Sequence, residues 1–238
     1  MKALLFLLFI TVFTAAETQN NAKYVNVFIG TDGTGHTFPG PSMPFGMVQP
    51  GPDNRDQGWN HTSGYQYRDS VILGFSQTRF NGTGISEMGD ILLLPFSAIQ
   101  DVNLKNRYHK NTEKAGVGYY CVTKKDGVKV ELTCSERVAF HRYTFPEEQG
   151  KVLADFQHGL RFMTDSLVLD SEVKIEDRHQ IRNTIPRFRS GMFTAGLFHC
   201  SKLLLRKKLT ASSTQCCCII SQPGFCRYGQ PGARTITA

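Results

Sequence analysis

The residues with the clearest capacity for chemistry lie in one loop, residues 30–47. Glycine and proline fill eight of its eighteen positions, so neither a helix nor a paired strand can run through it. The loop also carries His36 and two phenylalanines. Exposed backbone beside a polar ring and apolar faces is typical of a pocket wall. Together with Trp59 and the tyrosine-containing segment 63–67, the loop predicts a sugar-binding surface.

Each ring in this region has a functional and a structural interpretation. Trp59, the single tryptophan, would stack on the apolar face of a sugar or pack into a core. His36 would bond a sugar hydroxyl, with glycines allowing close approach, or bond a backbone carbonyl as a structural loop residue. Tyr65 and Tyr67 are two residues apart, so on a strand they share a face, which is either the core or the rim of the pocket.

Other charged residues have structural interpretations. We predict that Arg79 forms a salt bridge with Glu87 or Asp90. Glu147 and Glu148 follow a proline in a turn, so we expect them to be solvated rather than catalytic. The glycine-rich loop lacks the residues that complete a phosphate-binding or a calcium-binding loop. The sequence therefore assigns no catalytic residue and no metal ligand.

Short segments rich in β-branched and aromatic residues predict the scaffold. They recur at roughly ten-residue spacing, and no segment before residue 180 keeps a 3.6-residue apolar period for three turns. The predicted strands are 25–29, 71–76, 91–95, 118–123, 128–134, 138–146, 151–156 and 165–176. The pattern predicts an all-β fold, an antiparallel β-sandwich. Cys121 and Cys134 lie on the two arms of a predicted hairpin, where a disulfide could form after export.

Seven motifs, in order along the chain, carry a resemblance to a known family. They are residues 24–31, 33–40, 44–49, 63–67, 72–78, 82–84 and 89–95. In this order they resemble the N-terminal domain of glycoside hydrolase family 92, over about residues 24–177. The members of this family are secreted, calcium-dependent, exo-acting α-mannosidases.

The resemblance implies a β-sandwich that packs against a larger (α/α)₆ barrel, with the sugar pocket between the two. It implies that the sandwich contributes the loop 35–40 and Trp59, whereas the barrel supplies the general acid, the general base and most calcium ligands. The implied reaction is the inverting hydrolysis of α-1,2-linked mannose, which needs one carboxylic acid and one carboxylate. The predicted carbohydrate-binding residues are His36, Phe38, Gly40, Trp59 and Tyr65.

The N-terminus predicts export. Lys2 precedes about ten apolar residues, and small residues follow up to Ala16, so we interpret residues 1–16 as a secretory signal peptide. Ten apolar residues are too few to span a bilayer, which needs about 20. We therefore expect a secreted or periplasmic protein without a membrane span.

Residues 180–238 differ from the rest in composition. They contain nine basic residues, no acidic residue and five of the seven cysteines, so residues 1–179 carry −2 of the net charge of +7. Three interpretations compete: an arm for nucleic acid or anionic surfaces, a cysteine-rich secreted module, and out-of-frame translation. We favour the third. It predicts a disordered tail after a glycosidase domain at 24–179, and no nucleic-acid partner.

The sequence thus predicts the carbohydrate-binding N-terminal domain of an α-mannosidase-like glycoside hydrolase. The expected ligand is a mannose-containing glycan. The natural packing partner would be the barrel, which we expect to be missing from these 238 residues, so that the chain alone is inactive. The alternative is a freestanding β-sandwich module that binds mannan and has no enzymatic activity.

Overall fold

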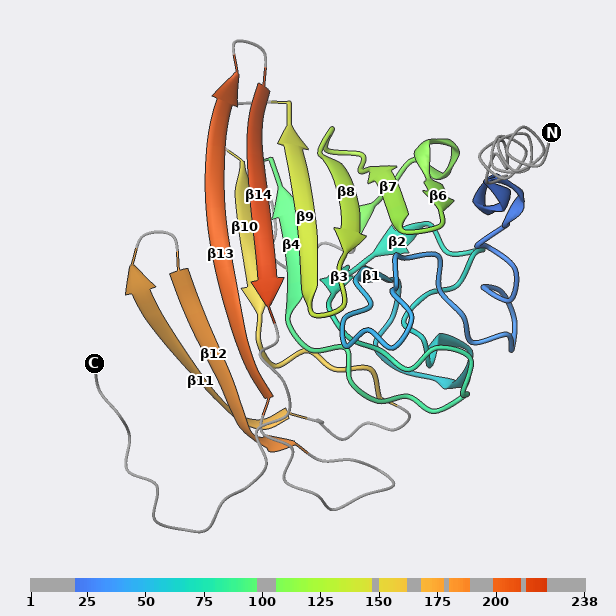
Figure 1. The fold of residues 1–238 in the computed structure, drawn as a ribbon, viewed down its shortest axis with the longest axis horizontal. Helices are drawn as coiled ribbons and strands as arrows, with labels where there is room; N and C mark the ends of the chain where they lie inside the picture. The colour runs from blue at the N-terminus through green and yellow to red at the C-terminus, as the bar shows by residue number, and fades with distance from the viewer. Residues whose placement is uncertain are drawn as a thin grey trace, which may run out of the picture.

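The computed structural model describes residues 20–97, 106–146 and 150–161, and the strands at 168–177, 180–188, 199–210 and 213–221. These residues form an antiparallel β-sandwich, as predicted (Figure 1). Helical structure within the described residues is limited to three short 3₁₀ turns, η1 (Asn21–Tyr24), η2 (Trp59–His61) and η3 (Lys110–Thr112).

Two sheets make up the sandwich. The smaller one has the order β1-β3-β4-β10, and its strands are β1 (Gly51–Asp53), β3 (Gly74–Ser76), β4 (Leu92–Phe96) and β10 (Lys151–Asp155). The larger one has the order β11-β12-β13-β14-β9-β8-β7-β6. Its strands are β6 (Lys114–Gly116), β7 (Tyr119–Thr123), β8 (Lys129–Cys134), β9 (Val138–Phe145), β11 (Val168–Asp177), β12 (Gln180–Phe188), β13 (His199–Thr210) and β14 (Ser213–Ser221). A separate pair joins β2 (Val71–Ile72) and β5 (Asn106–Arg107).

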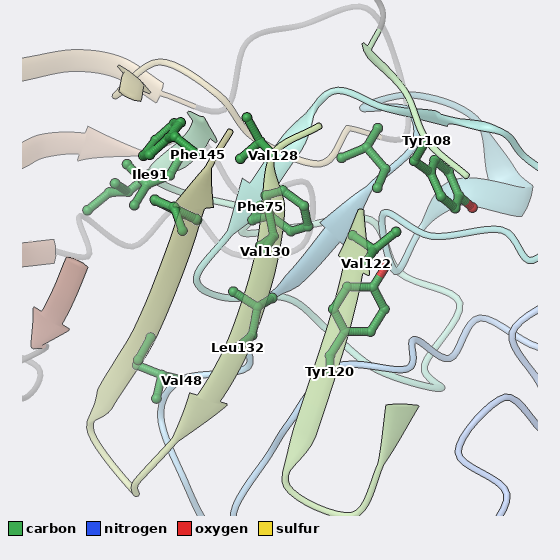
Figure 2. Close-up of a cluster of buried hydrophobic side chains, with 14 residues drawn as sticks. Val48, Phe75, Ile91, Tyr108, Tyr120, Val122, Val128, Val130, Leu132 and Phe145 are labelled. Atoms are coloured by element: carbon green, nitrogen blue, oxygen red, sulfur yellow. The ribbon is translucent and has the colours of Figure 1, made fainter. Parts of the chain in front are cut away.

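The core lies between the two sheets and collects the inward faces of their strands. Figure 2 shows Phe75 of β3 opposite side chains from β7, β8 and β9, such as Val122, Val130 and Phe145. Along β9 every second residue is buried, which is the alternation expected of a strand with one face on the core. This alternation explains why β9 was predicted from the sequence.

A buried histidine links the two sheets. His141 of β9 contacts the Gln77 Oε1 atom through Nε2 at 2.7 Å, and its Nδ1 atom lies 2.8 Å from the Tyr143 hydroxyl. Gln77 follows β3, and its amide nitrogen donates to the carbonyls of Phe75 and Ile91 at 2.8 and 3.1 Å. Burial lowers the pKa of His141 to about 3, so the ring is neutral at neutral pH.

Two predicted strands differ from the structure. The predicted strand 25–29 is absent: residues 25 and 26 have no regular structure, residues 27–30 form a turn, and Gly30 has a positive φ of 77°. The segment 71–76 is split into β2 and β3, which pair with different partners. β-branched composition alone was misleading here, because a strand also needs a partner backbone.

The two cysteines considered for a disulfide are free thiols. Cys121 is in register with Glu131, three positions before Cys134. An odd spacing places two residues on opposite faces of a sheet, and Cys134 packs against the core cluster. The hairpin was predicted correctly, but its register keeps the two sulfur atoms apart.

The segment predicted to be a disordered tail contains paired strands. β12 pairs with β11 across the predicted domain boundary at residue 179, and β14 lies between β13 and β9 (Figure 1). Disorder was expected because out-of-frame translation was the favoured interpretation, but backbone pairing does not require a particular composition. The origin of this segment in out-of-frame translation stays a prediction.

The predicted signal peptide, residues 1–16, and the Glu147–Glu148 turn lie outside the described residues. Within the part of the chain that is described, no helix is long and apolar enough to cross a membrane.

The neutral state of His141 predicts an acid-dependent stability. An unfolded histidine has a pKa of about 6.5. Between pH 6.5 and about pH 3, His141 binds a proton in the unfolded chain but not in the folded chain. The free energy of unfolding therefore falls as the pH decreases. We expect His141→Leu to be less stable than the parent at pH 7, because Gln77 and Tyr143 lose a partner. The difference should narrow by roughly 1 kcal/mol per pH unit below pH 6.5.

Urea unfolding at pH 7, 5.5 and 4 measures this difference. Val130→Ala is the matched control, because it opens a cavity in the same core without changing the number of ionisable groups. A constant difference between His141→Leu and the parent across this pH range would contradict a neutral buried histidine.

Candidate functional site

His36 lies in the glycine- and proline-rich loop in an unusual conformation. Its φ of 56° falls in the left-handed region, which is uncommon for residues other than glycine. The residue is only 6% exposed, and its Nε2 atom is buried without a hydrogen-bond partner among the described residues. A buried polar atom without a partner costs about 1–3 kcal/mol. Strain and an unsatisfied polar atom at one residue are typical of a binding site.

Trp59 lies beside His36. The two rings meet edge to face at 89°, with their centroids 4.7 Å apart. Trp59 begins η2 after Gly58, whose φ of 99° turns the chain at this point. The indole is 50% exposed, so the structure does not place it in the core. An exposed indole next to an unsatisfied polar atom can offer an apolar face and a hydrogen bond to one ligand.

A third segment, residues 82–84, lies against the His36–Trp59 pair. The Gly82 nitrogen donates to the His36 carbonyl at 2.7 Å. A Cβ atom on Gly84 would lie 3.0 Å from His36 Nδ1 and 3.2 Å from Trp59 Cη2. Glycine at position 84 therefore lets the chain pass close to both rings. In the sequence analysis this segment was one of the seven motifs of the resemblance, but it was not among the predicted site residues.

Phe38 and Gly40 follow His36 in the same loop and pack against each other. The Phe38 ring is 5% exposed and stacks on the Arg79 guanidinium, whose Cζ atom is 4.5 Å from the ring centroid. A Cβ atom on Gly40 would come within 2.4 Å of the Phe38 ring and 2.2 Å of the Pro50 carbonyl oxygen. Gly40 is thus required by packing, and the Phe38 ring is in contact with Arg79.

Tyr65 is fully buried, so of the two alternatives, the core and the rim of the pocket, the structure places it in the core. Its hydroxyl donates to the Glu113 carboxylate, with both oxygens at 3.0 Å, and accepts from Lys110 Nζ at 2.9 Å. Burial, followed by the charge of Glu113, raises the pKa of Tyr65 well above its usual value. Tyr67 lies in a turn and is exposed, and Lys110 Nζ lies 3.9 Å from its ring centroid. Neither residue lies in a strand, so the expectation that Tyr65 and Tyr67 share one face of a strand is wrong.

A buried ion pair between Arg79 and Asp53 lies beneath the candidate site, and the sequence did not predict it. Arg79 Nη1 lies 3.0 Å from Asp53 Oδ1, and both side chains are fully buried. Asp53 Oδ2 contacts His158 Nε2 at 2.9 Å. Burial lowers the pKa of Arg79, and the charge of Asp53 opposes this shift. A salt bridge of Arg79 was predicted, but with Glu87 or Asp90, whereas the ion pair is made with Asp53.

Side chains that bind metals are not gathered among the described residues. They contain no group of three or more histidine, cysteine, aspartate or glutamate side chains that could hold a metal. Asp53, Glu113 and Glu131 are buried carboxylates, and each contacts a basic side chain. We therefore derive no chemistry through a metal from these residues.

Comparison with known proteins decides the family. A model described as the glycosyl hydrolase family 92 N-terminal domain matches residues 24–199. The chain belongs to this family. The matched region contains all seven motifs that carried the resemblance, and it ends twenty residues beyond position 179.

Relatives of known sequence or structure agree with this assignment. An uncharacterised secreted glycosidase of Arthroderma benhamiae is 30% identical over 153 residues, which are 58% of this chain and 20% of the relative. The family GH92 α-mannosidase from Bacteroides thetaiotaomicron in complex with mannoimidazole has a TM-score of 0.68 at 26% identity. The match covers 84% of this chain and 30% of the mannosidase.

A second structure, the family GH92 inverting mannosidase from the same organism, has a TM-score of 0.64 at 18% identity. The match covers 87% of this chain and 30% of the second mannosidase. At 18% identity, this likeness shows a shared fold and nothing more. This chain therefore spans 20–30% of the length of these relatives.

In the structure of this family 92 N-terminal domain, the predicted site residues fall into two groups. His36 and Trp59 form one edge-to-face pair, with Trp59 exposed. Phe38, Gly40 and Tyr65 support this pair or the core from behind. Contact of any of them with a sugar stays a prediction.

The ion pair makes glycine obligatory at position 64 of the family 92 domain. Gly64 has a φ of 83°, and a Cβ atom there would lie 2.2 Å from Asp53 Oδ1. We expect Gly64→Ala to destabilise the chain by about 3–5 kcal/mol, as disruption of a buried ion pair does. Gly118→Ala is the control, because Gly118 has a φ of 76° and a Cβ atom added there would meet nothing within 4 Å. It should cost about 1–2 kcal/mol from backbone strain alone.

Urea unfolding of both variants and the parent measures these costs. Equal losses for the two glycines would show that the Asp53 carboxylate does not restrict position 64.

Proposed function

We propose that this chain is the sugar-contacting domain of an α-mannosidase-type glycoside hydrolase. The observation that carries the proposal is the His36–Trp59 pair, in which a buried, unsatisfied ring nitrogen adjoins an exposed indole. Family membership supports the substrate class, since the related solved structures are mannosidases.

In this proposal the two rings have different roles. The indole of Trp59 stacks on the apolar C–H face of a mannose ring, where burial of apolar area stabilises the complex. His36 Nε2 exchanges a hydrogen bond with one hydroxyl of the same sugar and so gains the partner that it lacks in the free protein. Its strained backbone fixes the direction of that bond before the ligand arrives.

We propose further that the carboxyl groups for hydrolysis come from a second domain. Inverting hydrolysis needs two carboxyl groups about 6.5–9.5 Å apart across the sugar. Three of the buried carboxylates, Asp53, Glu113 and Glu131, are already paired with basic side chains, which suits structural roles. Residues 1–16 would direct export, in keeping with the secreted relative.

The single tryptophan allows a direct test of sugar contact. We expect methyl α-mannoside to change the fluorescence of Trp59 in a saturable way, because the sugar would replace water at the exposed indole. Trp59→Ala should weaken binding at least about tenfold, measured by calorimetry, which corresponds to about 1.4 kcal/mol. Tyr24→Ala is the control, because Tyr24 is an exposed ring that contacts Lys23 and not His36.

Identical binding by the parent and Trp59→Ala would remove the proposed role of the indole. Absence of any mannoside binding by the parent would remove the proposed function of the chain as a sugar-contacting domain.

The chain alone should not hydrolyse mannosides. We expect no release of nitrophenol from p-nitrophenyl α-mannoside in calcium-containing buffer, because in this proposal the acid and the base of the reaction belong to the second domain. An active α-mannosidase in parallel reactions confirms that the assay works. Turnover above background that grows in proportion to the concentration of the chain would contradict the proposal of a second, catalytic domain.

A further inference from the structure

We propose that Arg79 is the positioning residue of the His36–Trp59 pair. The side chain touches neither ring, but it joins the three segments that meet at them. The importance of Arg79 for sugar binding rests on the proposed function. Its structural content can be tested without any sugar.

The first connection reaches the turn that carries Trp59. Arg79 Nη1 donates to the Ser63 carbonyl at 2.7 Å, four residues after the indole. The Ser63 hydroxyl in turn donates to the Thr37 carbonyl at 3.0 Å, next to His36. The turn and the loop are thus joined directly, and Arg79 holds that junction from the interior.

The second connection reaches the loop that carries His36. The guanidinium of Arg79 stacks on Phe38, two residues after His36, at 4.5 Å from the ring centroid. It also donates to the carbonyls of Gln49 at 3.1 Å, Gly51 at 2.8 Å and Pro52 at 3.2 Å. These contacts hold the loop at the end where it enters β1.

The third connection is the backbone of Arg79 itself. Arg79 forms an isolated antiparallel bridge with Met88, which closes the loop that contains Gly82 and Gly84. This loop donates to the His36 carbonyl and passes close to both rings. A displacement of Arg79 would therefore move all three sides of the candidate site.

The hydrogen-bond count explains why arginine suits this position. A guanidinium has five N–H donors in a fixed plane. Five hydrogen bonds are made, to the carbonyls of Gln49, Gly51, Pro52 and Ser63 and to the hydroxyl of Ser76. Asp53 supplies the counter-charge at 3.0 Å. Lysine would keep the charge, but it has three donors on one atom and cannot reach these acceptors together.

The test compares Arg79→Lys with the parent chain at a temperature where circular dichroism shows both to be folded. Acrylamide quenching of Trp59 fluorescence reports the exposure of the indole without a ligand. We expect quenching to rise in Arg79→Lys and the affinity for methyl α-mannoside to fall about tenfold. Val130→Ala, a core variant of reduced stability, should keep the quenching and the affinity of the parent.

Phe38→Leu serves if Arg79→Lys does not fold, because it removes the stacking partner and leaves the ion pair intact. It should raise Trp59 quenching in the same direction. Parent-like quenching in a folded Arg79→Lys or Phe38→Leu would overturn the inference. An equal rise in Val130→Ala would also overturn it, because that result indicates general loosening.

The outcomes separate this inference from the proposed function. If the parent does not bind mannoside but Arg79→Lys still exposes Trp59, the proposed function fails and the positioning role stands. If the parent binds mannoside and Arg79→Lys retains parent-like quenching and affinity, the proposed function stands and the positioning role fails.

Discussion

The candidate site depends on one buried ion pair, between Arg79 and Asp53. A charge without water is costly unless it is paired and fully hydrogen-bonded, and Arg79 meets both conditions. Four of its five hydrogen bonds go to backbone carbonyls, those of Gly51 and Pro52 in β1 and those of Gln49 and Ser63 in irregular segments. The side chain therefore joins irregular segments to a strand of the smaller sheet. The sandwich supplies rigidity through its core, and the ion pair extends that rigidity into the loops.

This arrangement accounts for the strain at His36. A non-glycine residue in the left-handed region, with a buried nitrogen that lacks a partner, persists only when its surroundings hold it there. The surroundings are identifiable. Trp59 packs against the imidazole, Gly82 bonds the His36 carbonyl, and Phe38 fixes the following turn by its stack on Arg79. A ligand that bonds the free nitrogen would recover part of the free energy spent on this conformation.

The sequence predicted those parts of the molecule whose cause is local. Strand β9 follows from alternation, because every second residue is buried, and the hairpin turn before β8 contains a glycine with a φ of 83°. His36 and Trp59 were both assigned to one predicted sugar-binding surface, and the structure brings them into contact. In contrast, the turn at residues 27–30 and the pairing of residues 180–221 depend on which backbone is within reach, and composition does not report that.

The inward orientation of Phe38 and Tyr65 could not be predicted for the same reason. A loop rich in glycine and proline has no periodicity that distinguishes its inner face from its outer face. That choice is made by Arg79, some forty residues after Phe38, and by Glu113, nearly fifty residues after Tyr65. The acidic partner of Arg79 was also misassigned, because Glu87 and Asp90 are near in sequence whereas Asp53 is near in space.

The position of β14 in the larger sheet affects how the chain can fold during synthesis. β14 lies between β9 and β13, so one edge of β9 is covered only by residues made some seventy positions later. Until that segment emerges, the hydrogen-bonding groups of β9 stay open to any other extended chain nearby. Closure of this sheet is thus a late, long-range event, and a slow step of this kind leaves nascent chains in need of chaperone protection.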